Sequence, residues 1–196
     1  MRIPRFTVHD VPFLIPLLGS IARFIGRLMG WKIIGRMPDV PKMVLIGVPH
    51  TSNWDYFVFL YGITVMRLRV IVLAKSTLFW WPLGTFLKFF GAVPVDRSQK
   101  YDRVQQGIDY MNSVEKGILL ITPEGTRSYQ DTWKSGFYHI AYGAQVPLVL
   151  GKLDFDKKII YIGDIFEMTG DYDKDIVAIR DYYKDCVPLN PDKFAF

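Results

Sequence analysis

The chain has 196 residues, enough for one well-buried domain and too few for two comfortable ones. Half of the residues are hydrophobic, only 22% are charged and the net charge is +5, a combination that favours contact with an anionic membrane surface. The positive charge alone would also suit a nucleic-acid binder. The basic residues are dispersed, however, and there is no zinc-finger or RNA-binding signature, so we expect no nucleic-acid partner.

The cysteine and histidine content argues against a disulfide-stabilised protein and against a zinc protein. A single cysteine, Cys186, cannot form an internal disulfide, which favours a reducing compartment. That cysteine and three scattered histidines, His9, His50 and His139, cannot build a zinc cluster, so we expect no metal. No secretory cleavage pattern is present, and no uncharged apolar run reaches the ~18 residues that a spanning helix needs.

Residues 1–35 are predicted to be an N-terminal membrane-associating segment. Residues 11–31 have the composition of a helix with a wide apolar surface, interrupted by a narrow basic stripe that contains Arg23 and Arg27. Such a helix is typical of an anchor that lies in the membrane interface, which predicts peripheral or monotopic association on the cytoplasmic face. The alternative is a core-packed helix whose two arginines reach water.

Residues 36–196 are predicted to form an α/β domain. β-rich runs alternate with helical patterns, which indicates a mostly parallel central sheet flanked by helices. The predicted strands cover residues 43–48, 70–74, 92–95, 117–122, 146–150 and 158–162. The predicted helices cover residues 54–66, 78–90, 101–114, 137–143 and 171–185. The helix over 78–90 is rich in aromatic residues, which suits a lipid-facing surface, an acyl pocket or an ordinary core.

The turn after the first of these strands contains a candidate catalytic pair. His50 follows Pro49, and Asp55 comes five positions later in the first turn of the predicted helix over 54–66. A carboxylate near a helix N-terminus is stabilised as an anion, and beside an imidazole it orients the ring and raises its basicity. The pair suits a general base for a hydroxyl group; the plain alternative is a turn histidine and a helix-start aspartate.

Cationic residues follow other strands of the same predicted sheet. Candidate phosphate-binding residues are Arg97 and the sequence Glu124, Gly125, Thr126 and Arg127, and two further cations are Lys75 and Lys134. If the strands are parallel, their carboxyl ends share one edge of the sheet, where α/β folds usually bind ligands. Each group taken alone is also compatible with a solvated surface turn.

Taken together, these blocks resemble the glycerophospholipid acyltransferases, which include the enzymes that acylate glycerol-3-phosphate and lysophosphatidic acid. The resemblance covers roughly residues 43–151. It is carried by the order and spacing of His50-x4-Asp55, Gly91-x5-Arg97, Glu124-Gly125-Thr126-Arg127 and Val146-Pro147.

The resemblance implies an acyltransferase domain in which His50 removes the proton from an acceptor hydroxyl and Asp55 orients the imidazole. The acceptor would be a lysophospholipid, foremost 1-acylglycerol-3-phosphate, with Arg97, Glu124, Gly125, Thr126 and Arg127 at its phosphate. Lys75, Lys134 or backbone amides of the His50 turn would stabilise the oxyanion or line the pocket. No cofactor is implied, because acyl-CoA or acyl-carrier protein is the co-substrate.

Three other functions remain open at this level. A different lyso-lipid could be the acceptor, a thioesterase would use His50 to activate water, and a lipid-binding module would need no catalysis. The two cationic blocks argue against the thioesterase, because water has no phosphate to anchor. A lipid-binding module has no need for both His50 and Asp55.

Overall fold

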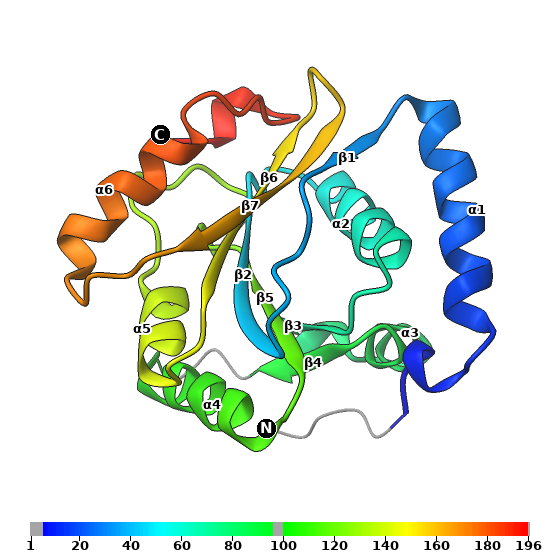
Figure 1. The fold of residues 1–196 in the computed structure, drawn as a ribbon, viewed down its shortest axis with the longest axis horizontal. Coiled ribbons are helices and arrows are strands. Elements are labelled where there is room, and N and C mark those ends of the chain that lie inside the picture. Colours follow the sequence, from blue (N-terminus) through cyan, green and yellow to red (C-terminus); the bar gives the residue numbers. More distant parts are fainter. Residues whose placement is uncertain (1–5, 96–99, 196) are drawn as a thin grey trace.

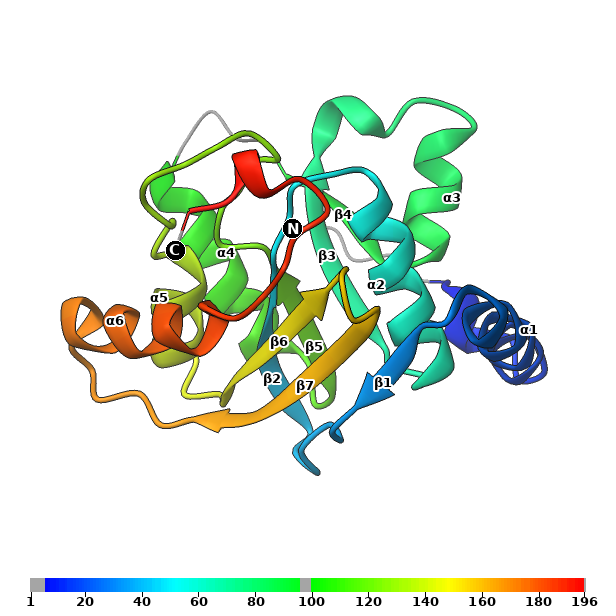
Figure 2. The same ribbon diagram turned by 90° about the horizontal axis from the view of Figure 1, so that it is seen from above.

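The computed structural model describes residues 6–95 and 100–195. Its centre is a seven-stranded sheet in the order β1-β7-β6-β2-β5-β3-β4 (Figures 1 and 2). The strands are β1 (Lys32–Ile34), β2 (Lys42–Val48), β3 (Val70–Lys75), β4 (Ala92–Val95), β5 (Gly117–Ile121), β6 (Leu148–Asp154) and β7 (Ile159–Phe166). Every neighbouring pair runs parallel except β6 and β7, which are antiparallel. The predicted fold class, a mostly parallel sheet flanked by helices, is confirmed.

Helices cover both faces of this sheet (Figure 1). They are α1 (Leu14–Met29), α2 (Trp54–Val65), α3 (Leu83–Phe89), α4 (Lys100–Ser113), α5 (Gly136–Gly143) and α6 (Tyr172–Tyr183), with short 3-10 turns η1 (Val8–Asp10), η2 (Ser76–Leu78) and η3 (Pro191–Lys193). One apolar core lies between the sheet and α4, α5 and α6, and a second lies under α2. β2 contributes to both, because alternate side chains of a strand point to opposite faces: Val44 and Ile46 enter the first core, Met43 and Leu45 the second.

Two features of the chain differ from the sequence prediction. The prediction of one helix over residues 78–90 is wrong, because η2 ends at Leu78 and α3 starts only after Pro82. Proline has no amide proton and favours the start of a helix over its interior, which accounts for the break. The strand β1 was not predicted. It comprises residues of the segment 1–35 that pair with β7, and three residues are too few for a recognisable alternation.

The helix α1 contacts the domain through a narrow strip of small residues. Ile15, Gly19 and Gly26 are its buried positions, and all three lie next to residues of α2. A Cβ atom at Gly19 would lie 3.1 Å from the carbonyl oxygen of Thr64, and one at Gly26 would collide with the ring of Tyr61. These glycines therefore allow α1 to approach α2 closely. Within the described ranges, no helix is both long enough and apolar enough to cross a membrane.

Candidate active site

The site lies where β2 and β5 end side by side. These strands are adjacent and parallel, so the turn that begins at Pro49 and the loop that begins at Thr122 leave the sheet at the same edge (Figure 2). The backbone N–H of His50 donates a hydrogen bond to Oε1 of Glu124 at 2.9 Å. Strand pairing thus brings together two of the predicted blocks that are 74 residues apart in the chain.

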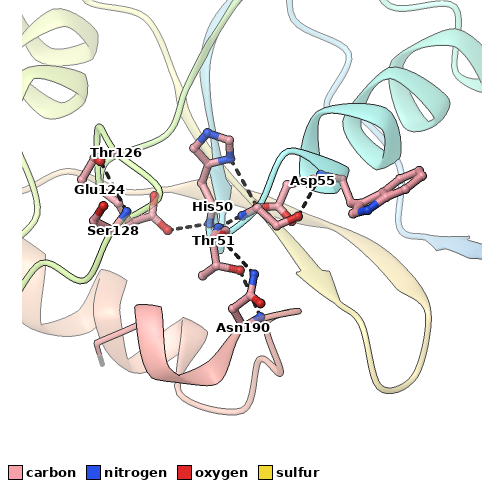
Figure 3. Close-up of polar contacts among 9 residues, drawn as sticks. His50, Thr51, Asp55, Glu124, Thr126, Ser128 and Asn190 are labelled. Atoms are coloured by element: carbon pink, nitrogen blue, oxygen red, sulfur yellow. Dashed lines mark hydrogen bonds and ion pairs between the residues drawn. The ribbon is translucent and has the colours of Figure 1, made fainter.

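His50 and Asp55 face each other across the turn (Figure 3). His50 Nδ1 lies 3.4 Å from Asp55 Oδ2. The side chain of His50 is 22% exposed, whereas Asp55 is fully buried in the first turn of α2. At 3.4 Å the contact is an electrostatic one and longer than a normal hydrogen bond, a common state of catalytic pairs without substrate.

Backbone amides hold the carboxylate of Asp55 in place. Its Oδ2 atom accepts hydrogen bonds from the N–H groups of Thr51 at 2.6 Å and Ser52 at 2.7 Å. Two short hydrogen bonds of this kind fix the direction of the carboxylate group. With Asp55 on the Nδ1 side of the ring, the second ring nitrogen of His50 lies on the opposite side, away from α2 (Figure 3). The imidazole is thus placed with one nitrogen toward a fixed carboxyl group and the other toward the open side of the turn.

Glu124 forms a wall of the site and has an unusual protonation equilibrium. It is only 5% exposed, and burial raises its pKa to about 7, against the opposing effect of backbone N–H donors that include that of His50. One carboxyl oxygen accepts the bond from His50, and the other, Oε2, is buried without a partner among the described residues. Glu124, predicted at the acceptor's phosphate, therefore also supports the backbone of His50.

The loop after Glu124 brings several predicted residues to the same edge. Gly125 has φ +66°, a conformation that favours glycine, and the side chain of Lys134 packs against it. The backbone N–H of Lys134 donates to the carbonyl of Pro123 at 2.9 Å. Thr126 is half-buried and its Oγ1 accepts a hydrogen bond from Ser128 N at 3.3 Å, whereas Arg127 is exposed.

Another predicted residue, Lys75, lies at a more distant strand end. Lys75 is exposed at the end of β3, and β5 separates that strand from β2. Arg97 lies outside the described residues, and its predicted role stays a prediction. In the part of the chain that the structure describes, no group of three or more His, Cys, Asp or Glu side chains could hold a metal ion.

Sequence reasoning missed two residues of this site. Thr51 is 1% exposed and links the turn to Asn190 (Figure 3), whose backbone N–H donates to Thr51 Oγ1 at 3.3 Å and whose side-chain amide donates to the Thr51 carbonyl at 3.0 Å. Asn190 follows the last long helix of the chain and is part of no motif. Its only sequence signal is the Asn-Pro step at 190–191, which predicts a turn.

Comparison with known proteins supports the assignment suggested by this geometry. The chain resembles the crystal structure of PlsC, a 1-acyl-sn-glycerophosphate (LPA) acyltransferase from Thermotoga maritima, with a TM-score of 0.58 and 14% identity over 88% of this chain and 78% of that one. At this identity the likeness establishes the fold alone. A comparison with curated protein sequences finds no match. A model of the acyltransferase family matches residues 35–149, more than half of the sequence, and the chain therefore belongs to the acyltransferase family.

Proposed function

We propose that this protein moves a fatty acyl group from an acyl thioester to the hydroxyl group of a lysophospholipid in phospholipid biosynthesis. The donor is acyl-CoA or acyl-carrier protein, and the foremost acceptor is 1-acylglycerol-3-phosphate. The observation that carries the proposal is the His50–Asp55 pair at 3.4 Å, held by the turn amides and tied to Glu124 of the second block. The acyltransferase family and the likeness to PlsC support the same reaction class.

In the proposed reaction the acceptor's own hydroxyl is the nucleophile. The ring nitrogen of His50 that faces away from Asp55 takes the hydroxyl proton while the oxygen attacks the thioester carbonyl carbon. Asp55 stabilises the imidazolium that forms. The tetrahedral intermediate then expels the thiolate as the C–S bond breaks, and His50 returns the proton to the sulfur. The products are an ester and a free thiol, so atoms and charge balance without a cofactor.

The oxyanion that forms in the reaction needs hydrogen-bond donors. Thr51 N and Ser52 N donate to Asp55, His50 N donates to Glu124, and Trp54 N donates to Ser52 Oγ at 2.8 Å. These bonds weaken the case for the turn amides. Lys134 and Lys75 are the other two candidates. Lys134 is favoured, because it packs on the residue that follows Glu124.

The phosphate of the acceptor is assigned to the basic loop beside His50. Thr126 and Arg127 offer hydroxyl and guanidinium donors, and Gly125 lets the backbone approach a ligand closely. The guanidinium matches a phosphate in a two-pronged contact. Glu124 carries the backbone contact to His50, which couples this loop to the base. Arg97 completes the proposed phosphate site on sequence grounds alone.

We also propose peripheral association with the cytoplasmic face of a membrane. Opposite its glycine strip, α1 exposes apolar side chains that share one surface: Leu17, Ile21, Phe24, Ile25, Leu28 and Met29. Exposed aromatic residues follow β3, with Trp81 84% exposed and Trp80 60%. In both ribbon views α1 and α3 lie on the side of the sheet that carries α2 (Figures 1 and 2). Apolar side chains on this side, together with Arg23 and Arg27, suit an anionic lipid surface.

A thiol-trapping assay tests the proposed reaction. Purified protein should release free CoA from acyl-CoA, or the free thiol of acyl-carrier protein, only when 1-acylglycerol-3-phosphate is present. Equal release without an acceptor would favour the thioesterase, and no release with either donor and any lyso-lipid acceptor would refute acyl transfer.

A histidine variant tests the base itself. His50→Ala should lower kcat about 10²- to 10⁴-fold, because a general base contributes that much, and should leave vesicle binding unchanged. His139→Gln is the matched control, because His139 is exposed on α5. Loss of vesicle binding together with activity would make His50 a structural residue.

A further inference from the structure

The chain after α6 crosses the edge of the sheet directly beside the catalytic turn. Its 3-10 turn η3 lies next to Thr51 (Figure 3). Asn190 precedes η3 and makes two hydrogen bonds to Thr51, from its backbone N–H to the hydroxyl at 3.3 Å and from its side-chain Nδ2 to the carbonyl at 3.0 Å. Residues 139 positions apart are thereby joined at the turn that holds the candidate base.

Thr51 is the residue through which such a contact reaches His50 and Asp55. It follows His50 in the chain, is 1% exposed, and its N–H donates the 2.6 Å bond to Asp55 Oδ2. Its carbonyl points to the opposite side of the same turn and accepts from Asn190. This carbonyl shares its peptide group with the N–H of Ser52, which donates the 2.7 Å bond to Asp55 Oδ2. Because a buried carbonyl without a donor is costly, the bond from Asn190 favours the orientation of this peptide group in which the Ser52 N–H meets Asp55.

The segment that carries Asn190 is itself fixed at both ends. Before it, the carbonyl of Val187 accepts a hydrogen bond from Phe155 N at 2.9 Å. After it, Phe194 is 6% exposed and belongs to the core that also contains Trp133 and Tyr183. Because the backbone on both sides of Asn190 is fixed, Asn190 loses little conformational freedom when it binds Thr51. It is therefore suited to hold the Thr51 turn rigidly.

We propose that Asn190 is a positioning residue for acyl transfer. It holds the Thr51–Ser52 peptide group so that the Ser52 N–H stays on Asp55 and the His50 ring stays in its reactive orientation. The inference rests on the proposed function, because it assumes that His50 is the base. It goes beyond the family resemblance, because Asn190 lies outside the matched residues 35–149.

The kinetic test compares two substitutions at one position with a control in the same turn. Asn190→Ala removes the donor, and Asn190→Asp keeps the shape but places a carboxylate oxygen against the Thr51 carbonyl. We expect kcat to fall about 10- to 100-fold in the alanine variant and further in the aspartate variant, with KM for the acceptor within about twofold. Asp192→Ala, at an exposed position of η3, should match the wild type.

A second pair of variants covers the case in which changes at Asn190 prevent folding. Thr51→Val removes the hydroxyl that accepts the Asn190 N–H, and Thr51→Ser keeps it. We expect kcat to fall in the valine variant and to recover in the serine variant. Equal activity of the two would overturn the role of this hydrogen bond.

Amide hydrogen exchange separates this inference from the proposed function. In Asn190→Ala, exchange at Thr51 and Ser52 should become at least about tenfold faster, whereas Asp192→Ala should leave it unchanged. If the wild type transfers no acyl group but exchange is faster in Asn190→Ala, Asn190 still holds the turn in place. In that case the proposed function is refuted and the structural role of Asn190 is not. Unchanged exchange together with unchanged kcat in Asn190→Ala would overturn the inference.

Discussion

The carboxyl group of Glu124 combines burial with a contact to the candidate base. Its raised pKa of about 7 means that the folded protein binds a proton there which the unfolded chain, with the ordinary value 4.5, has already released. Stability from this group is therefore complete below pH 4.5 and is lost as the pH rises through about 7.

Glu124→Gln should remove this pH dependence. The wild-type free energy of unfolding should decline by about 3 kcal/mol relative to the variant as the pH rises from 4.5 through about 7. Urea denaturation at several pH values measures the difference. Glu115→Gln, at an exposed position, serves as the control and should show no such trend. Parallel curves for wild type and Glu124→Gln would contradict the raised pKa.

At the scale of the element, α1 has two faces with different tasks. Its small residues meet α2, and its large apolar residues remain exposed, with Phe24 63% and Leu28 73% exposed. The helix thus packs on the domain with one side, and its apolar surface is wider than that contact. Binding of that surface to a membrane stays a prediction.

Polar substitutions on the exposed face of α1 test this prediction without disturbing its packing. Phe24→Ser with Leu28→Ser should weaken vesicle binding by at least about tenfold, because a buried large apolar side chain contributes roughly 1.5–3 kcal/mol. Val177→Ser is the matched control, because Val177 is 69% exposed on α6, on the other side of the molecule (Figure 1). A vesicle sedimentation assay measures both, and equal binding of the two variants would exclude α1 as the anchor.

The same vesicle assay can also test the basic stripe of α1, Arg23 and Arg27. Arg23→Gln with Arg27→Gln should weaken binding to anionic vesicles and leave binding to neutral ones nearly unchanged. Each cation near an anionic lipid surface contributes about 1 kcal/mol, and salt should remove the difference.

At the scale of the whole molecule, a buried polar network docks the loop after β7 and the start of α6 on α5. Tyr138 OH donates to Asp175 Oδ2 at 2.6 Å and accepts from Gly170 N at 3.0 Å. Asp175 also accepts from Thr169 N at 2.7 Å and from the Thr169 hydroxyl at 2.8 Å. Burial would raise the pKa of Asp175, but these hydrogen bonds outweigh it and lower the pKa below the ordinary 3.8.

Tyr138→Phe should lower the free energy of unfolding by about 1–3 kcal/mol at neutral pH, because Gly170 N–H loses its acceptor and Asp175 loses a donor. Tyr142→Phe, at an exposed neighbour, should have little effect. The stability that the lowered pKa provides is complete above 3.8 and is lost as the pH falls through the lowered value, so the Tyr138→Phe deficit should shrink in that acidic range. Chemical denaturation at neutral and acidic pH checks both expectations.

Much of this molecule follows from local patterns in its sequence. Apolar runs, their alternation with helical stretches and the turn residues after them predict the α/β class and most of the strands, because periodicity reports which faces must be buried. The spacing of His50 and Asp55 also predicts their contact, since both belong to one strand-to-helix turn. The prediction of one helix over 78–90 was wrong because an apolar aromatic run has no clear period. Pro82 determines where the observed helix α3 begins.

Contacts between distant segments were decided only by the tertiary structure. Glu124 reaches the backbone of His50 because β5 pairs with β2, and Asn190 reaches Thr51 because the chain returns to that edge after α6. The raised pKa of Glu124 likewise depends on burial by surrounding elements. By itself, the sequence determined the chemistry available at each strand end. Strand order, which depends on how all the apolar faces are buried at once, determined which of those ends meet.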